Sequence, residues 1–272
     1  MEEQPFYSQK WNLATVQANY VKFDIQIHDV IENQGVEGDS ESTIEILEWL
    51  YDKTGTIDSY FSFPAAAQAK QLPIMKWLKD KNVPFGHALL RAVECGDMEQ
   101  IKWLLDNGCD RDECTFECAA PNRQVMQFLF ENGFRPNSRA MANTAQKGTL
   151  EDMKWLQSLG CPIDESSIVS VIGFFSRTDL DSDNLQKIQW LLDQGFPTSL
   201  ALSQMAATRG DLTLLKMLKA NKCKFNQTTF KRAVERDKTE NVEWLIQIKC
   251  PRHKDVAKFA KSDAMRRLLN QQ

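Results

Sequence analysis

The chain repeats one short apolar pattern, in which an aromatic residue or a methionine is followed directly by leucine. Eight such pairs occur: Trp49-Leu50, Trp77-Leu78, Trp103-Leu104, Phe128-Leu129, Trp155-Leu156, Trp190-Leu191, Met217-Leu218 and Trp244-Leu245. Neighbouring pairs are 25 to 28 residues apart, except for one spacing of 35 residues between Trp155 and Trp190. A near-constant period in this range is typical of a stacked repeat array rather than of a globular enzyme core.

Each pair lies on a predicted short helix that has one apolar face. In the third copy, Ile101, Leu104 and Leu105 recur at steps of three and four residues, which places them on one stripe. Asp97 can cap the start of this helix, and Gly108 can take the left-handed conformation that ends it. We expect the repeated leucines to be fully buried and the tryptophans before them to be largely buried.

A second kind of short helix precedes each of these, as segment 88–96 (ALLRAVECG) shows most plainly. Its pattern is a large residue with small or apolar residues three and four positions later: Leu89-Ala92-Val93, Met141-Thr144-Ala145 and Phe230-Ala233-Val234. Two helices per repeat, each with one apolar face, cannot bury that face alone, so neighbouring copies must cover it. The sequence therefore predicts an all-α repeat protein.

Segments 142–162 (ANTAQKGTLEDMKWLQSLGCP) and 202–218 (LSQMAATRGDLTLLKML) resemble ankyrin repeats. In that family, two alanine-like residues are followed by a Gly-Asp or Gly-His turn, a hydrophobic helix and a terminal glycine. Segment 161–166 (CPIDES) is similar to the Cys-Pro-Trp-Asp-Glu variant found in ankyrin proteins of giant viruses and protists. The resemblance spans residues 43–272 and implies an ankyrin-like helical solenoid of about eight or nine repeats that binds a partner protein.

The chain departs from the family pattern in two ways. The usual period is about 33 residues, and the Thr-Pro-Leu-His start of the first helix is missing from every copy. Phe116 follows Cys109 by only seven positions, which is too few for a projecting hairpin between repeats. We therefore expect shortened hairpins between the repeats.

Composition agrees with an intracellular array. Aliphatic and aromatic residues make up 42% of the chain, and no apolar run approaches the roughly 20 residues needed to cross a bilayer. The start, MEEQPFYSQK, lacks the basic and apolar regions of a secretory signal. We expect a cytoplasmic monomer that does not enter a membrane.

The seven cysteines do not form a metal or disulfide pattern. Cys109, Cys161, Cys223 and Cys250 share one repeat position with Phe134 and Phe196, so phenylalanine can replace them. Cys109, Cys114 and Cys118 lie close in sequence, but no Cys-x-x-Cys pair and no nearby histidine completes a zinc site. We expect free thiols, no metal and a reducing compartment.

The long spacing contains an insertion near residues 177–184, RTDLDSDN. Asp179, Asp181 and Asp183 alternate as in a calcium loop, but Asn184 and Trp190 stand where an EF-hand would need glycine and glutamate. A solvated loop is the preferred interpretation.

No catalytic pattern is present. The three histidines, His28, His87 and His253, follow no nucleophile motif, and neither a phosphate-binding loop nor a dinucleotide-binding motif occurs. The sequence therefore predicts a protein that is not an enzyme and holds no cofactor.

Residues 1–42 do not follow the repeat and allow two interpretations. Apolar residues such as Trp11, Val16 and Ile31 can form two helices that cap the end of the array. Val21, Phe23, Ile25 and Ile27 alternate with polar residues instead, as in a strand of a small adaptor module.

Charge is unevenly distributed along the chain. Residues 1–60 contain 12 acidic and 3 basic residues, whereas residues 219–272 contain 6 acidic and 14 basic residues. Such a field can steer a charged partner. Nucleic-acid binding by the basic C-terminal third is the alternative function, although acidic residues are interleaved there and no aromatic stacking platform accompanies them.

The candidate binding surface is the exposed side of the first helix of each repeat, which lines the concave face of an ankyrin-like stack. Counting from the large residue of that helix, the positions two, five and six residues later are expected to point outward. These positions hold Arg91, Glu94, Asn143, Gln146, Lys147, Met205, Thr208, Arg209, Arg232, Glu235 and Arg236. Arg209, Arg232 and Arg236 are predicted to form a basic row that is free to engage an acidic partner.

Overall fold

The computed structural model describes residues 10–35, 38–58, 60–173, 180–195 and 198–270. Within these ranges the chain is helical and contains no strand, which confirms the predicted all-α class. The chain divides into two compact units, Met1–Phe134 and Arg135–Gln272.

Unit 1 contains nine of the described helices. They are α2 (Leu13–Phe23), α3 (Ile27–Gln34), α4 (Ser40–Thr54), α5 (Ser62–Gln68), α6 (Leu72–Asp80), α7 (Ala88–Cys95), α8 (Met98–Asp106), α9 (Thr115–Cys118) and α10 (Arg123–Glu131). From α3 onward they are paired: α3 packs against α4, α5 against α6, α7 against α8, and α9 against α10. The first members of the pairs also contact one another in the order α3, α5, α7, α9.

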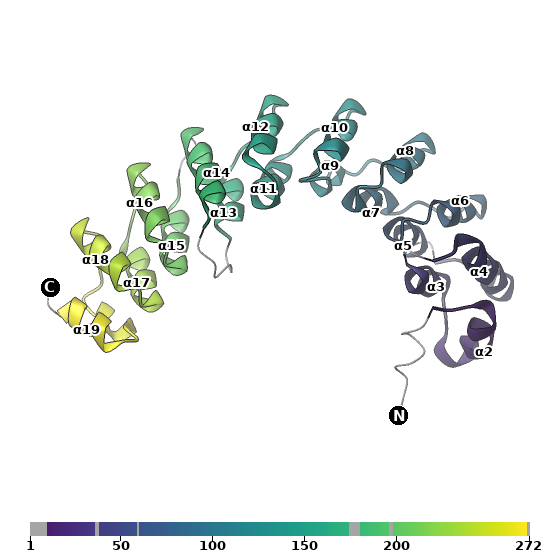
Figure 1. The fold of residues 1–272 in the computed structure, drawn as a ribbon, viewed down its shortest axis with the longest axis horizontal. Coiled ribbons are helices and arrows are strands. Elements are labelled where there is room, and N and C mark those ends of the chain that lie inside the picture. The colour runs from purple at the N-terminus through teal and green to yellow at the C-terminus, as the bar shows by residue number, and fades with distance from the viewer. Residues whose placement is uncertain (1–9, 36–37, 59, 174–179, 196–197, 271–272) are drawn as a thin grey trace. The chain divides into compact units, whose positions relative to one another are not determined.

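Unit 2 has the same organisation. Its helices are α11 (Ser138–Lys147), α12 (Leu150–Ser158), α13 (Glu165–Ile172), α14 (Ser182–Asp193), α15 (Leu200–Arg209), α16 (Leu212–Ala220), α17 (Gln227–Arg236), α18 (Thr239–Gln247), the 3₁₀ helix η1 (Val256–Phe259) and α19 (Asp263–Asn270). The odd-numbered helices α11 to α17 pack in succession, and each contacts the even-numbered helix that follows it. We call the first member of each pair a first helix and the other a second helix. Within each unit the first helices form one row and the second helices another (Figure 1).

The N-terminal segment is helical where the structure describes it. Ile25 and Ile27, which could have belonged to a strand, are buried at the start of α3. Helix α3 packs against α4 and α5 and thus takes the position of a first helix, while α2 packs against α4. Helix pairing begins with α3 at Ile27, and residue 43, the expected start of the array, lies inside α4.

Six of the second helices end with the same hydrogen bond, which explains a large part of the repeat. Six residues after the tryptophan position, a backbone N–H donates to the carbonyl of the repeated leucine, and this hydrogen bond closes the helix as in a Schellman motif. The donor and acceptor pairs are Val83 and Leu78, Cys109 and Leu104, Phe134 and Leu129, Cys161 and Leu156, Cys223 and Leu218, and Cys250 and Leu245. The residue before each donor has a positive φ angle, and it is glycine at positions 108, 133 and 160 but Asn82, Lys222 and Lys249 elsewhere.

The repeated leucines form the core, as predicted. Leu104, Leu156 and Leu191 each have 0% of their surface exposed. The tryptophans before them are less buried than expected, because Trp103, Trp155 and Trp190 remain partly exposed. A tryptophan at this position of a second helix contacts the neighbouring second helix. The Lys79 ammonium of α6, for example, lies 5.8 Å from the centre of the Trp103 ring of α8. The aromatic position therefore joins neighbouring second helices at the surface.

One such junction in unit 1 includes an ion pair. The Trp77 indole Nε1 donates to Glu48 Oε1 over 2.6 Å, and the Lys81 ammonium donates to Glu48 Oε2 over 2.9 Å. The hydrogen bonds from Lys81 and Trp77 lower the pKa of the Glu48 carboxyl. Through these contacts α4 and α6 are connected by polar groups as well as by packing.

The seven cysteines are all free, and those at the repeated position are buried. Burial raises the pKa of Cys109, Cys161 and Cys250 to about 11. Alkylation requires the thiolate, so we expect these three thiols to react with iodoacetamide at pH 8 only after denaturant is added. Mass spectrometry of the labelled chain should count seven modified cysteines after unfolding, and a chelator should leave the melting temperature unchanged. Rapid labelling of Cys109 in the folded protein would contradict this expectation.

Candidate partner-binding surface

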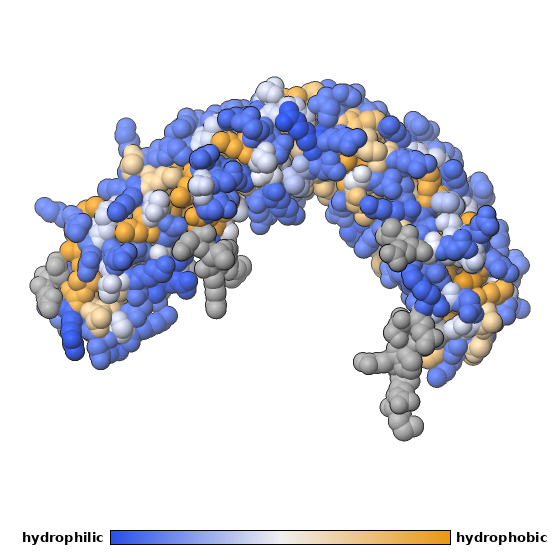
Figure 2. Space-filling view, viewed as in Figure 1, coloured by the Kyte–Doolittle hydropathy of each residue, from blue (hydrophilic) through white to orange (hydrophobic). Residues whose placement is uncertain are grey.

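The predicted surface residues differ in exposure. Arg91, Glu94, Gln146, Lys147, Thr208, Arg232 and Arg236 are exposed, Asn143, Arg209 and Glu235 are partly exposed, and Met205 is buried. Hydrophilic residues cover most of the face shown in Figure 2, with smaller hydrophobic patches between them. The expectation of outward-facing side chains is therefore met by most members of the set and fails clearly at Met205.

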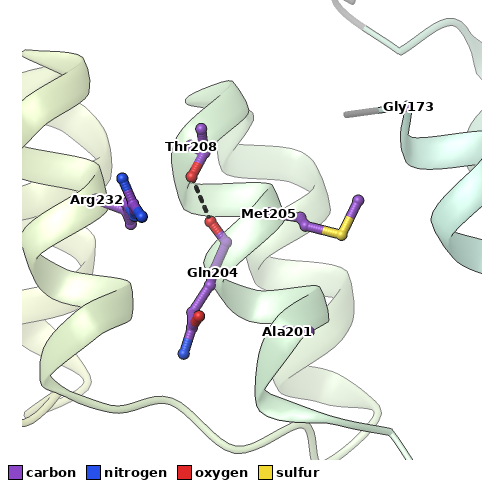
Figure 3. Close-up of a pocket in the computed structure, with 6 residues that line it drawn as sticks. All are labelled: Gly173, Ala201, Gln204, Met205, Thr208 and Arg232. Carbon is purple, nitrogen blue, oxygen red and sulfur yellow. Dashed lines mark hydrogen bonds between the residues drawn. The ribbon is translucent and has the colours of Figure 1, made fainter. Parts of the chain in front are cut away.

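Met205 was expected to be exposed, but only 8% of its surface reaches solvent. Its side chain points toward Gly173 at the end of α13 (Figure 3). Helix α13 has 8 residues, whereas α11, α15 and α17 have 10 each, so it ends one half-turn early. Gly173 caps α13 with a φ of 65° and stands where the neighbouring first helices carry Gln146 and Thr208. Met205 therefore extends toward a position that carries no side chain.

The same short helix leaves a pocket of about 200 Å³ beside α15. Gly173, Ala201, Gln204, Met205, Thr208 and Arg232 line it. In Figure 3, Arg232 approaches from α17 on the side opposite Gly173, and the Thr208 hydroxyl donates to the Gln204 carbonyl over 2.8 Å. Ala201 and Met205 provide an apolar lining, and the Gln204 amide and the Arg232 guanidinium are available at its edge. The pocket can thus accept an apolar side chain next to a hydrogen-bonding or anionic group.

Arg209 does not belong to a free basic row. Its Nη1 donates to the Ile172 carbonyl over 2.6 Å and to the Gly173 carbonyl over 3.4 Å. These are the last carbonyls of α13, where the helix dipole favours a positive charge. Arg236 repeats the arrangement one pair later, because its Nε donates to the Arg209 carbonyl over 3.2 Å. Of the three arginines, Arg209 and Arg236 therefore connect neighbouring first helices by hydrogen bonds.

Arg232 is the member of the row that is exposed and forms its ion pair within its own helix. Its closest ion pair is with Glu235 on the same helix, at 3.4 Å, and both side chains are accessible. The pair Arg91 and Glu94 on α7 has the same spacing, with a distance of 2.9 Å. Exposed pairs of this kind contribute little to stability, so Arg232 can exchange Glu235 for a partner's carboxylate at small cost.

The structure brings together three of the predicted residues, Met205, Thr208 and Arg232, in one pocket. Asn143, Gln146 and Lys147 lie on α11 of the same unit but do not line it, and Arg91 and Glu94 belong to unit 1. Sequence reasoning missed Gly173, Ala201 and Gln204. A glycine at a position that carries polar side chains in the neighbouring copies was the available signal.

The acidic residues of the insertion have structural roles where they are described. Asp181 caps α14 by accepting from the Asn184 backbone N–H over 2.8 Å, and Asp183 pairs with Lys187 over 2.8 Å. Asp179 lies outside the described residues. Across the described part of the chain, no group of three His, Cys, Asp or Glu side chains is placed to hold a metal ion.

The basic C-terminal segment is partly neutralised by its own acids. Lys258 pairs with Asp255 at 3.1 Å, and Arg266 pairs with Asp263 at 2.6 Å. In the described ranges, no helix combines the length and the apolar character needed to cross a membrane. Comparisons with protein-family models and with curated protein sequences find no match to this chain.

Proposed function

We propose that the chain is an ankyrin-like repeat array that works as a non-catalytic scaffold and binds a partner protein on the exposed side of its first helices. The observation that carries this proposal is the pocket beside Met205. It is a concave site with an apolar lining and a polar edge, located on a row of helices whose other outward positions are polar and varied. Such a combination is typical of sites that recognise one anchoring side chain of a partner.

The packing of the helices supports the ankyrin-like part of the proposal. First helices contact first helices, and each is joined to a second helix. Small residues, such as Ala206 and Ala207 on α15, are fully buried at these contacts, which lets neighbouring first helices approach closely. The absence of strands in the described ranges agrees with loops that replace the projecting hairpins of the family.

The chemistry of the pocket defines the expected anchor. An aliphatic or methionine side chain can pack against Met205 and Ala201, where each buried methylene contributes about 0.8 kcal/mol. A carboxylate within one or two residues of that side chain can accept hydrogen bonds from the Arg232 guanidinium. The partner should therefore present an apolar residue beside an acidic one.

Filling the pocket tests this proposal. Peptides should be selected from a random display library on the intact chain and their affinities measured by fluorescence anisotropy. Ala201 is exposed, so Ala201→Trp should block the pocket without disturbing the core. We expect this variant to weaken binding of the selected peptides at least tenfold, and Arg232→Glu to weaken the acidic ones at least fivefold.

The matched control is Ala220→Trp, because Ala220 is an exposed alanine of the same unit that lies on second helix α16, outside the pocket. It should change the affinities less than twofold. Equal losses from both tryptophan variants would contradict the proposed site. Binding of random duplex DNA that weakens steeply with increasing salt concentration would favour the alternative function, nucleic-acid binding by the basic C-terminal third.

A further inference from the structure

A row of aromatic rings follows the N-terminal ends of three consecutive first helices in unit 1. His28 lies in the first turn of α3, Phe61 directly precedes α5, and His87 directly precedes α7. The His28 and Phe61 ring centres are 5.3 Å apart, those of Phe61 and Tyr60 are 4.9 Å apart, and those of Tyr60 and His87 are 6.2 Å apart. The four rings thus form one continuous series across α3, α5 and α7.

Two of these rings are exposed to an extent that packing does not require. Tyr60 is 62% exposed and Phe61 is 50% exposed, whereas Phe63, two residues later, is completely buried and anchors α5. Exposed aromatic residues that are rigidly held next to one another are frequent at interaction surfaces. The side chains of Tyr60 and Phe61 are therefore available to a partner.

Carboxylates hold this series in place and surround it. Asp58 Oδ1 accepts from the backbone N–H groups of Tyr60 over 2.8 Å and Phe61 over 3.0 Å, which fixes the turn that presents both rings. Asp112 Oδ2 lies 3.3 Å from Nδ1 of His87, and both side chains are about half exposed. Acidic groups therefore stand beside the rings at both α5 and α7.

The whole edge is acidic. The segments that precede α3, α5, α7 and α9, together with the first turn of α3, contain six acids: Asp24, Asp29, Asp58, Asp110, Asp112 and Glu113. Lys81 and Arg111 are the two basic residues of these segments. The Lys81 ammonium pairs with Glu48 over 2.9 Å, and the Arg111 guanidinium donates to the Asn132 carbonyl over 2.8 Å and lies over the Phe134 ring. We name the four rings and these six acids the aromatic–acidic edge.

We propose that the aromatic–acidic edge binds an extended segment of a partner protein that carries an arginine or lysine at every third residue. Cations are attracted to the faces of tyrosine and phenylalanine rings, and the neighbouring carboxylates add charge complementarity. The spacing follows from geometry. Packed helices lie about 8 to 10 Å apart, and a polyproline II segment advances about 9.3 Å for every three residues, so consecutive basic side chains meet consecutive first helices.

This proposal goes beyond the pocket of unit 2, since it concerns a different surface, a different unit and a partner of opposite charge. It also accounts for a feature that the repeat leaves unexplained, namely the exposed Tyr60 and Phe61. A nucleic acid does not fit this edge, because its phosphates would be repelled by the carboxylates.

The test compares two labelled nine-residue peptides of identical composition. In one, Arg-Pro-Pro occurs three times, and in the other the three arginines are adjacent. Fluorescence anisotropy with the full chain should show at least fivefold tighter binding of the spaced peptide. Tyr60→Ser/Phe61→Ser should weaken that binding at least tenfold, and Asp112→Asn at least threefold.

Val21→Ser provides the matched control, because Val21 is 90% exposed on α2 and lies outside the edge. It should leave the affinity within twofold, and circular dichroism should show unchanged helix content in every variant. Equal affinity for the two peptides, or no loss in both the double variant and Asp112→Asn, would overturn the proposal. Sedimentation velocity tests whether the edge binds a second copy of the chain instead. If the chain self-associates, the double variant abolishes this association and neither peptide binds, the edge binds the basic segment of a second copy.

Discussion

Replacing Leu104 with alanine is expected to lower the free energy of unfolding of unit 1 by about 2 to 5 kcal/mol, the usual cost of truncating a fully buried leucine. Leu104 lies in the middle of α8, none of its surface is exposed, and its carbonyl accepts the hydrogen bond from Cys109 that ends the helix. Leu104 therefore contributes both to the packing between helix pairs and to the hydrogen bond that ends the second helix.

Urea denaturation followed by tryptophan fluorescence measures this effect, since Trp103 is the adjacent residue. Leu105→Ala is the control, because Leu105 is the next residue of the same helix and is partly exposed. It should cost clearly less than Leu104→Ala. Similar losses at both positions would show that the register assigned to the second helices is wrong. Leu156 and Leu191, which are equally buried in unit 2, should behave like Leu104.

The second large effect is expected at Arg209. Arg209→Met keeps most of the aliphatic stem but removes the guanidinium that donates to the Ile172 and Gly173 carbonyls. Hydrogen bonds to charged groups contribute about 1.5 to 3 kcal/mol, so unit 2 should lose stability in this range. Arg209→Glu should cost more, because it places a carboxylate against the negative end of the α13 dipole.

Arg232→Met on the next first helix is the control for Arg209. Arg232 is exposed and pairs only with Glu235 among the ion pairs of the described residues, so its loss should change stability by about 0.5 kcal/mol or less. Thermal and urea denaturation of both variants give the comparison. If Arg209→Met were as stable as Arg232→Met, the hydrogen bonds to α13 would not contribute, and Arg209 would be available to a partner after all.

The repeat pattern predicted the helices and their buried faces well, because burial of Leu104 or Leu156 follows from a local period. The prediction failed where a residue's environment depends on its neighbours in the next pair. Met205 has the same position as Arg91 and Arg232, yet it is buried because α13 ends early at Gly173. Arg209 has an outward position, but its long side chain reaches the preceding first helix.

The aromatic–acidic edge illustrates a different limit of sequence reasoning. Tyr60 and Phe61 lie between predicted helices, where the sequence does not reveal which of several apolar residues enters the core. Phe63 is buried and Phe61 is half exposed, although both belong to the same short segment. Asp58, two residues before Tyr60, was a local signal of a fixed turn. The contacts of His28 with Phe61 and of His87 with Tyr60 arise only when α3, α5 and α7 pack side by side.

The arginines at the ends of the first helices give unit 2 a polarity along the chain. Arg209 closes the end of α13, and Arg236 closes the end of α15, so these two helices are completed by a side chain from the first helix that follows. Removing α17 would expose the last carbonyl of α15, whereas removing α13 would merely release the Arg209 guanidinium into water, where it is well solvated. Removal of a helix pair should therefore destabilise the neighbouring pair on its N-terminal side more than the neighbouring pair on its C-terminal side.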